Sequence, residues 1–169
     1  MSKTTSTKVK SLKVSQEKPA AVVEKPKEKT IEKAKPIDND FQVVLEGQAK
    51  KLSPKTEGHI RFQLIKDKSK TLHLKMVSNS NGGNFSKNPI PFKLIESVLS
   101  KQDKSKSFKS TILKEAFVGK GSKSANNTSF LAAVLRSKEI ALIVPSDKSQ
   151  FLSNLSPEFK VQSKKLLAL

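Results

Sequence analysis

Lysine side chains give this chain its main chemical property, a strong positive charge. The sequence holds 33 lysines and arginines against 15 aspartates and glutamates, so its formal net charge is +18 over 169 residues. A surface of this kind attracts polyanions through its long-range field and through the release of their counterions. The composition therefore predicts a class of partner, namely nucleic acid, an anionic membrane face or an acidic protein, and it indicates no reaction.

Only two of the 33 basic residues are arginines. Arginine presents a planar fork that can grip a base edge or a phosphate at two points, whereas lysine is a hydrated point charge. The excess of lysine favours contacts with a phosphate backbone over readout of base sequence. A genome rich in AT would also favour lysine over arginine, although it explains the shortage of acidic residues less well.

The positive side chains gather in predicted turns and on one predicted pair of strands. The residues expected to contact nucleic acid are Arg61, Lys66, Lys68, Lys70, His73, Lys75, Phe85, Lys87, Lys104, Lys106, Lys109, Lys120 and Lys123. Phe85 belongs to this set because it lies in a polar loop, where its ring could stack on a base. The other interpretation of Phe85 is that it folds back into the core.

Residues 119–123, Gly-Lys-Gly-Ser-Lys, have the composition of a phosphate-binding loop without its spacing. The P-loop needs a glycine, four residues and then Gly-Lys-Ser/Thr, so nucleotide hydrolysis is not predicted. A glycine-rich backbone flanked by lysines can still approach a phosphate closely. The segment is therefore open to two interpretations, a phosphate-contacting loop or an ordinary flexible loop.

The sequence predicts no catalytic residue, no metal ligand and no cofactor. Cysteine is absent, which excludes disulfides and thiolate ligands. The two histidines, His59 and His73, come without a cluster of carboxylates, and no serine has a base and an orienting group in a recognisable pattern. We therefore do not expect this protein to be an enzyme.

No segment of the sequence is typical of a membrane span or a secretory signal. Residues 1–21 have lysines but no apolar run, and no stretch approaches the roughly 20 apolar residues that cross a bilayer. We expect a protein that makes no membrane contact and is cytoplasmic, or nucleoid-bound or nuclear, and not secreted.

The first 40 residues differ from the rest of the chain. They contain ten lysines, six acidic residues and almost no large apolar residue, and Pro19, Pro26 and Pro36 interrupt any helix. Too little apolar surface is present to offset the entropy of ordering, so residues 1–40 are predicted to be a disordered tail. The tail is either a solubilising tether or a basic arm that lies along phosphate. Residues 41–169 are also basic, with 23 basic and 9 acidic side chains.

The clearest local pattern is an alternation of apolar and polar residues in 60–65 and again in 72–77. Two such segments around a short polar connection are typical of an antiparallel hairpin with one apolar face. The other face is expected to show Arg61, Gln63, His73 and Lys75, so every charge on it would be positive.

The remaining elements are predicted from apolar spacing and from Pro, Gly and Asn signals. We expect a strand at 41–46, a helix from Pro91 to Lys101, and a strand over 108–118 that is either continuous or broken near Glu115. We also expect a helix beginning near Asn126, a buried strand at 140–144 ended by Pro145, and a short helix from Ser146 through Leu155. Residues 157–169 fit neither period. Phe62, Leu74, Ile95, Leu135 and Ile143 are predicted to be buried.

Strand, basic loop and helix follow one another in residues 59–101, and the order returns in 108–138. The two stretches are either pseudo-repeated units or chance neighbours, since few residues are identical. The order of hairpin, glycine-rich turn, Ser86-Lys87 and helix is similar to that of the Whirly and positive-cofactor-four group of single-strand binders. This resemblance implies a curved antiparallel sheet that faces nucleic acid, with helices behind it.

Taken together, these patterns predict a single α+β domain over residues 41–169, with an antiparallel sheet packed on two to four helices. The expected function is binding of DNA or RNA, single strands included, mainly through phosphate and without strong sequence specificity. The alternative is a scaffold or adaptor that docks an acidic protein or a larger assembly. The sequence does not indicate an oligomeric state.

Overall fold

The computed structural model describes residues 40–53, 57–117, 124 and 126–169. The chain divides into two units, Met1–Ala34 and Lys35–Leu169, and every described residue belongs to the second. Almost all of the predicted tail (residues 1–40) therefore lies outside the described residues, as do Lys120 and Lys123.

Strands and helices are mixed along the described part of the second unit. In chain order they are β1 (Phe41–Lys50), β2 (His59–Asp67), β3 (Leu72–Asn79), β4 (Ile90–Pro91), α1 (Phe92–Ser100), β5 (Phe108–Lys109), the 3₁₀-helix η1 (Ser110–Ala116), α2 (Asn126–Leu135), β6 (Ile143–Ser146), β7 (Ser149–Leu155) and α3 (Phe159–Leu167). The strands form a four-stranded sheet in the order β1-β2-β3-β4 and a three-stranded sheet in the order β5-β7-β6, with antiparallel pairing throughout. The prediction of an α+β fold is confirmed.

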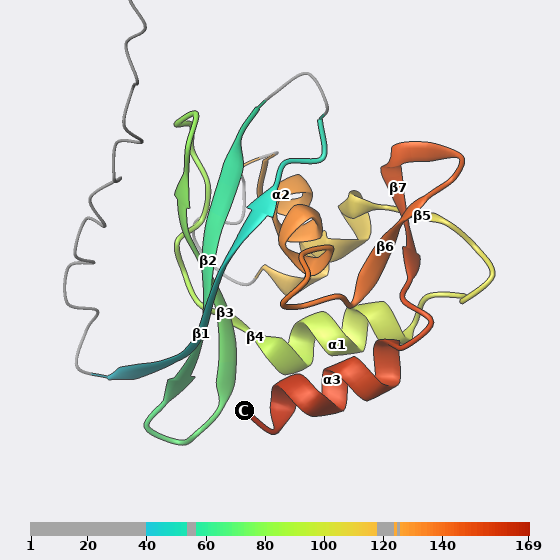
Figure 1. Cartoon of the computed structure of the whole chain (residues 1–169). Helices are drawn as coiled ribbons and strands as arrows, with labels where there is room; N and C mark the ends of the chain where they lie inside the picture. Colours follow the sequence, from blue (N-terminus) through green and yellow to red (C-terminus); the bar gives the residue numbers. More distant parts are fainter. Residues whose placement is uncertain (1–39, 54–56, 118–123, 125) are drawn as a thin grey trace, which may run out of the picture. The chain divides into compact units, whose positions relative to one another are not determined.

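The predicted hairpin is confirmed as β2 and β3, and β1 pairs along the other side of β2. Ile60, Phe62 and Leu64 of β2 are at most 1% exposed, and Leu74 and Met76 of β3 are fully buried. Because side chains alternate between the two faces of a strand, these residues form one apolar face. Figure 1 shows that the helices lie on one side of β1, β2 and β3.

The turn between β2 and β3 uses a residue in the left-handed conformation. The N–H of Lys70 donates to the Asp67 carbonyl at 2.9 Å, and the N–H of Asp67 donates to the Thr71 carbonyl at 3.1 Å. Lys70 has φ 60°, where glycine is the usual residue in such a hairpin loop. The Asp67 carboxylate accepts a further bond from the N–H of Thr71 at 2.9 Å, and this bond helps to hold the turn.

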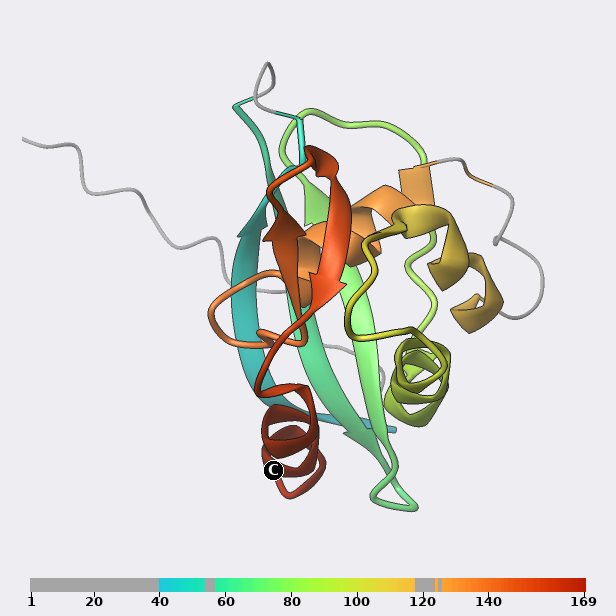
Figure 2. The ribbon, with the colours of Figure 1, turned by 90° about the vertical axis from the view of Figure 1, so that its right-hand side faces the viewer.

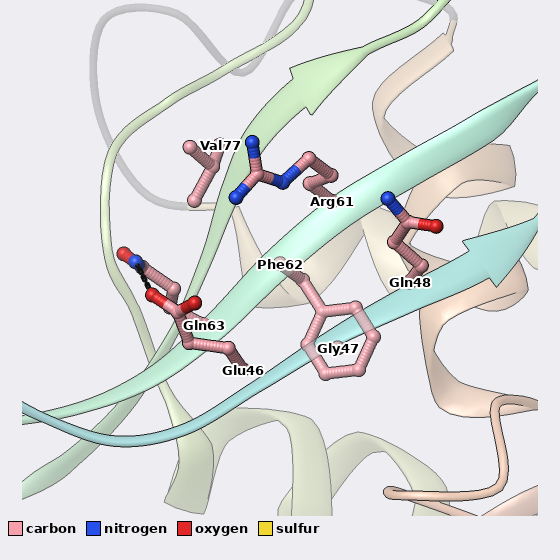
Figure 3. Close-up of a pocket in the computed structure, with 7 residues that line it drawn as sticks. All are labelled: Glu46, Gly47, Gln48, Arg61, Phe62, Gln63 and Val77. Carbon is pink, nitrogen blue, oxygen red and sulfur yellow. Dashed lines mark hydrogen bonds between the residues drawn. The ribbon is translucent and has the colours of Figure 1, made fainter. Parts of the chain in front are cut away.

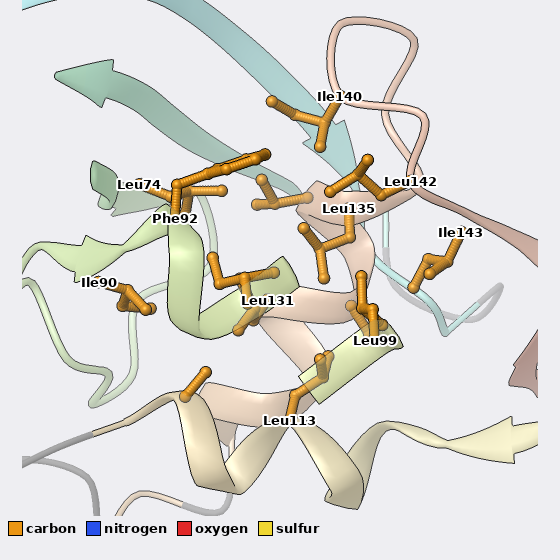
Figure 4. Close-up of a cluster of buried hydrophobic side chains, with 14 of the residues drawn as sticks. Leu74, Ile90, Phe92, Leu99, Leu113, Leu131, Leu135, Ile140, Leu142 and Ile143 are labelled. Carbon is orange, nitrogen blue, oxygen red and sulfur yellow. The ribbon is translucent and has the colours of Figure 1, made fainter. Parts of the chain in front are cut away.

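The core lies between the apolar face of the four-stranded sheet and the helices (Figures 1 and 2). Phe92 and Leu99 of α1 and Leu131 and Leu135 of α2 are fully buried there, and Figure 4 shows how their side chains meet. Burial of each large apolar side chain contributes about 1.5–3 kcal/mol. The burial predicted for five residues is confirmed, each being at most 1% exposed: Phe62, Leu74, Ile95, Leu135 and Ile143.

The helix expected to start at Pro91 begins one residue later, at Phe92. Pro91 itself belongs to β4, where it pairs with His73. The helix expected near Asn126 is confirmed as α2. Its last carbonyls are all bonded: the carbonyl of Leu135, for example, accepts the N–H of Leu142 at 3.0 Å.

The predictions for residues 140–155 are partly wrong. The strand expected at 140–144 is β6, which starts at Ile143 and continues through Pro145. Proline is tolerated there because β6 is an edge strand that pairs only with β7. The helix expected over 146–155 is instead β7, and Asp147 and Lys148 form the turn between the two strands.

The strand expected over 108–118 is also mostly wrong. Only β5 is extended, and the chain then forms η1, in which the buried residues Leu113 and Ala116 are three positions apart. This spacing places them on one side of a 3₁₀-helix. The two stretches proposed as repeats therefore differ, because the second has a two-residue strand and η1 where the first has a hairpin.

Residues 157–169, which fit neither period in the sequence, form α3. Its buried residues are Phe159, Ser163 and Leu166, which follow one face of the helix. The middle one is a serine, whose hydroxyl donates to Oε1 of Glu96 at 2.5 Å. A polar residue on the buried face hides the helical pattern of apolar residues.

Candidate nucleic-acid interface

The outer face of the four-stranded sheet, opposite the helices, carries several of the residues predicted to bind. Gln63 is paired across strands with Lys75 on β3 and with Glu46 on β1, and Arg61 lies two residues before it on the same face. The prediction that every charge on this face is positive is wrong, because Glu46 lies there and its Oε1 accepts a hydrogen bond from Nε2 of Gln63. The face is mixed in charge along its middle.

A shallow hollow of about 210 Å³ opens on this outer face (Figure 3). Its lining is Glu46, Gly47, Gln48, Arg61, Phe62, Gln63 and Val77. Figure 3 shows the guanidinium of Arg61 extended toward Val77, apart from the bonded pair of Gln63 and Glu46. Within the described residues Arg61 forms no ion pair, so its fork is open to a phosphate or another anion.

The other end of the outer face is apolar and closed. Ile65 is fully buried although it faces away from the helices, and it is paired across strands with Val43 and His73. The ring of His73 also meets Phe41 edge-on at 5.9 Å. Nε2 of His73 lies 3.0 Å from Oδ2 of Asp67, so this histidine is held by partners within the domain.

The two histidines do not meet, because they lie at opposite ends of the hairpin. His59 is paired with Lys50 at the start of β2, whereas His73 is paired with Ile65 near its end. Among the described residues no three histidine, aspartate or glutamate side chains gather as a metal site. In the same part of the chain, no helix has the length and apolar character needed to span a membrane.

The turn lysines Lys66, Lys68 and Lys70 lie together at the far end of the hairpin, as predicted. Lys68 forms an exposed ion pair with Asp40. Asp67, beneath them, accepts bonds from the Ser69 hydroxyl at 2.6 Å, from His73 and from the N–H of Thr71. These bonds, the one from Ser69 most of all, hold the pKa of Asp67 well below its usual range.

The loop after β3 places Lys87 in solvent but turns Phe85 inward. Phe85 is partly buried against the core and meets Phe130 edge-to-face, with ring centroids 6.1 Å apart. Of the two interpretations of Phe85, the structure supports packing on the core. One side of the Phe85 ring is therefore already in contact with Phe130 and the core.

Lys104, Lys106 and Lys109 lie apart from the outer face of the sheet. They follow α1, in the connection to β5 and in β5 itself, on the opposite side of the helices from β1, β2 and β3 (Figure 1). Lys106 pairs with Asp103 at 3.3 Å. The N–H of Ser105, more than any other group, lowers the pKa of Asp103. The predicted binding residues thus form at least two separate groups.

Sequence reasoning missed two adjoining hollows beside the end of β1. The first, of about 510 Å³, is lined by residues 48–52 of β1 and its continuation and by residues 136–139 after α2. The second, of about 330 Å³, shares Lys51 and Leu52 with the first and reaches Phe151 of β7. Phe151 is 53% exposed. Its position was hidden because 146–155 was predicted to be a helix.

Comparisons of this chain with protein-family models, with curated proteins and with solved structures gave no match. The resemblance to Whirly and positive-cofactor-four proteins is therefore not confirmed, and it stays a prediction from the order of elements in the sequence.

Proposed function

We propose that this protein binds nucleic acid, mainly through contacts between its lysines and the phosphate backbone. The observation that carries the proposal is the way in which the acidic side chains are used. Glu46 accepts a bond from Gln63, Glu96 accepts one from Ser163, and Asp67 is bonded by Ser69 and His73. These three carboxylates are bonded to neutral or histidine donors and form no ion pair with a lysine of the described residues.

Ion pairs with carboxylates neutralise little of the positive charge of the lysines. Among the described residues, lysine–carboxylate pairs within 4 Å are Lys68–Asp40, Lys101–Glu115 and Lys106–Asp103. Their side chains are half-exposed or more, so each pair is screened by solvent and is readily exchanged for a phosphate. Residues 41–169 hold 23 basic and 9 acidic side chains, and most lysines that the structure describes form no ion pair with a carboxylate.

The distribution of these charges favours a contact without base specificity. Arg61 and Lys75 lie on the outer face of the sheet and Lys87 in the adjoining loop, while other lysines border the turn and the connection after α1. Lysines spread in this way suit a backbone whose charge repeats evenly along its length. Arginine, which reads guanine edges at two points, is nearly absent from the sequence.

Filter binding with the full chain tests the proposal. The probes are single-stranded and duplex DNA and RNA of one length, each at a low and a moderate salt concentration. We expect binding of all four at low salt, weakened by salt and little changed by a change of base sequence. Absence of binding to any of them at low salt would overturn the proposal.

An acidic partner protein is the competing outcome of the same experiment. Polyglutamate, added as a competitor at equal charge, should displace nucleic acid only weakly if evenly spaced phosphates are preferred. Retention of polyglutamate with no retention of nucleic acid would instead favour the scaffold or adaptor function.

A further inference from the structure

The two hollows beside β1 are neighbours, one with a basic lining and the other with an aromatic lining, and together they are called the groove, with a basic end and an aromatic end. They meet at Lys51 and Leu52, which line both. Gln48 lines the basic end and also the hollow on the outer face of the sheet. A chain molecule that contacts Arg61 on the sheet could therefore continue over the end of β1 into this groove.

The basic end is lined by four cationic side chains and one carboxylate, and one of the four, Lys51, places its Nζ over the Phe130 ring of the aromatic end. Lys50 and Lys51 come from β1 and the residue after it, and Arg136 and Lys138 come from the turn after α2, with Glu139 as the acid. None of the four cations forms an ion pair within the described residues. The net positive charge of this end favours an anion.

Two polar atoms of the same turn also remain unused. Nε of Arg136 and the hydroxyl of Ser137 are buried and lack a hydrogen-bond partner in the part of the chain that the structure describes. The carbonyls at the end of α2 do not compete for the cations, because those of Val134 and Leu135 accept the N–H groups of Ser137 and Leu142. The donors within reach of a ligand at this end are the exposed ammonium groups of Lys50 and Lys138, and the Glu139 carboxylate is its one acidic group.

The aromatic end is built by Phe130 of α2 and Phe151 of β7. Lys51 Nζ lies 5.6 Å from the centroid of the Phe130 ring. Phe151 shares a face of β7 with the buried residues Ser153 and Leu155, but at its position the strand extends beyond the core and its ring is 53% exposed. Asn79, Asn126 and Ser129 also line this end.

Arg136 fixes Phe151 in this position. Its Nη1 donates to the Gln150 carbonyl at 2.8 Å and its Nη2 to the Leu152 carbonyl at 2.7 Å, so the guanidinium holds β7 on either side of Phe151. The same arginine borders the basic end. The aromatic wall and the basic end are thus tied to each other through one side chain.

We infer that this groove is the site where a single strand of nucleic acid enters, with a phosphate at the basic end and an unpaired base against Phe151. The inference rests on the proposed function and gives it a site and a preference for single strands. A ring offers its face to any base, whereas the bases of a duplex are stacked on one another and cannot reach it.

The chain lacks tryptophan and tyrosine, so one introduced tryptophan reports its own surroundings alone. We expect the fluorescence of the Phe151→Trp variant to be quenched by unlabelled oligo(dT) or oligo(U), and much less by a duplex bound to the same extent. The matched control is Val161→Trp on α3, where the native side chain is 68% exposed. Its fluorescence should not respond to single strands. The stronger of the two single-strand responses identifies DNA or RNA.

Affinity gives an independent readout. Phe151→Ala should weaken binding of the single strand roughly 5- to 150-fold, the equivalent of one stacked base, and leave duplex binding within about twofold. Phe151→Leu keeps the apolar bulk and should lose most of the same affinity, and it guards against a folding defect in the alanine variant. Val161→Ala should change neither affinity.

The role of the basic end is tested with two double variants that remove the same amount of charge, one in the groove and one on α3. Lys50→Ala with Lys138→Ala should weaken single-strand binding more than Lys160→Ala with Lys164→Ala on α3. Equal effects of the two pairs, or equal losses of single-strand and duplex binding in Phe151→Ala, would overturn the groove while leaving the proposed function intact. Failure of the unaltered chain to bind any nucleic acid would instead overturn the proposed function itself.

Discussion

At the scale of single residues, close contacts tie β1 to β2. Gly47 is paired with Phe62, and the phenylalanine ring lies across the position that a side chain would need. A Cβ atom at residue 47 would come within 2.5 Å of Cζ and 2.8 Å of Cε1 of Phe62. Because Phe62 is 1% exposed, its ring cannot swing out into solvent without opening the core.

Gly47→Ala should therefore destabilise the domain by about 1–3 kcal/mol, the usual cost of overpacking. Urea unfolding followed by circular dichroism measures this loss. Gln48→Ala, one residue along the same strand, is the control and should be nearly neutral. The alanine should be better tolerated in a Phe62→Leu background, and a Gly47→Ala protein as stable as the parent would show that the ring does not occupy this space.

Asp67 predicts a dependence of stability on pH. Its pKa in the folded protein is lowered, first by the Ser69 hydroxyl and then by His73 and the N–H of Thr71, from an ordinary value of 3.8. A group with a lowered folded pKa stabilises the protein fully above its unfolded pKa, and this contribution is lost as pH falls from about 3.8 through the folded value.

The unfolding midpoint in urea, measured at pH 6 and at pH 3 or lower, should fall more in the parent than in Asp67→Asn. The asparagine variant should be the less stable protein at pH 6, and the gap should narrow in acid. A constant gap between the two proteins over this range would show that the carboxylate is not the group responsible.

Residue-level prediction from the sequence succeeded where one local rule decided the outcome. Alternation alone placed Phe62 and Leu74 in the core, and both are buried. The left-handed turn at Lys70 could not be predicted, because lysine occupies a position where hairpin turns usually have glycine. Glu46, although it belongs to the predicted strand 41–46, was not expected on the outer sheet face, because nothing in the sequence indicated that this strand pairs with β2.

At the scale of elements, the structure depends on pairings that local sequence does not reveal. The apolar run 140–144 was expected to be a strand stopped by Pro145, but Ile140 and Leu142 are buried in the connection and the strand begins at Ile143. Pro145 is acceptable because β6 lies at an edge, a fact set by the partner β7 and not by the run itself. The same missing pairing hid Phe151 and hence the groove.

Ile143→Ala should cost roughly 2–5 kcal/mol, because the side chain is 1% exposed and its removal leaves a cavity. Thermal or urea unfolding measures the loss. Val144→Ala is the matched control, since the next residue faces the other side of β6 and is only half-buried. A cost for Ile143→Ala no larger than that for Val144→Ala would contradict the register of β6 on β7.

At the scale of the whole molecule, the fold and the expected binding surface were predicted from different properties of the sequence. The fold class followed from apolar periodicity, whereas the expected interface followed from composition, which names a partner class but not a surface. The three-dimensional arrangement separates Lys104 and Lys109 from the outer face that carries Arg61 and Lys75. Composition does not show which lysines share a surface, because lysines distant in sequence come together only through tertiary packing.

The outer face can be distinguished from general charge attraction by two triple variants of equal charge. Arg61, Lys75 and Lys87 replaced by alanine should weaken binding to all base sequences alike and reduce the slope of log Kd against log salt by about 0.9 for each lost duplex contact. Lys160, Lys164 and Lys165 of α3, replaced in the same way, should have a smaller effect. Identical behaviour of the two triples would mean that net charge, and not this face, determines affinity.

The salt dependence of binding by the unaltered chain tests the central claim most directly. Fluorescence anisotropy with one labelled oligonucleotide, between about 50 and 200 mM salt, should give a straight line of log Kd against log salt, with a slope set by the number of phosphates contacted. Changes of single bases should leave that line in place. Absence of binding at the low-salt end, despite a net charge of +18, would contradict the claim. So would tight binding that persists at high salt and vanishes on a single base change.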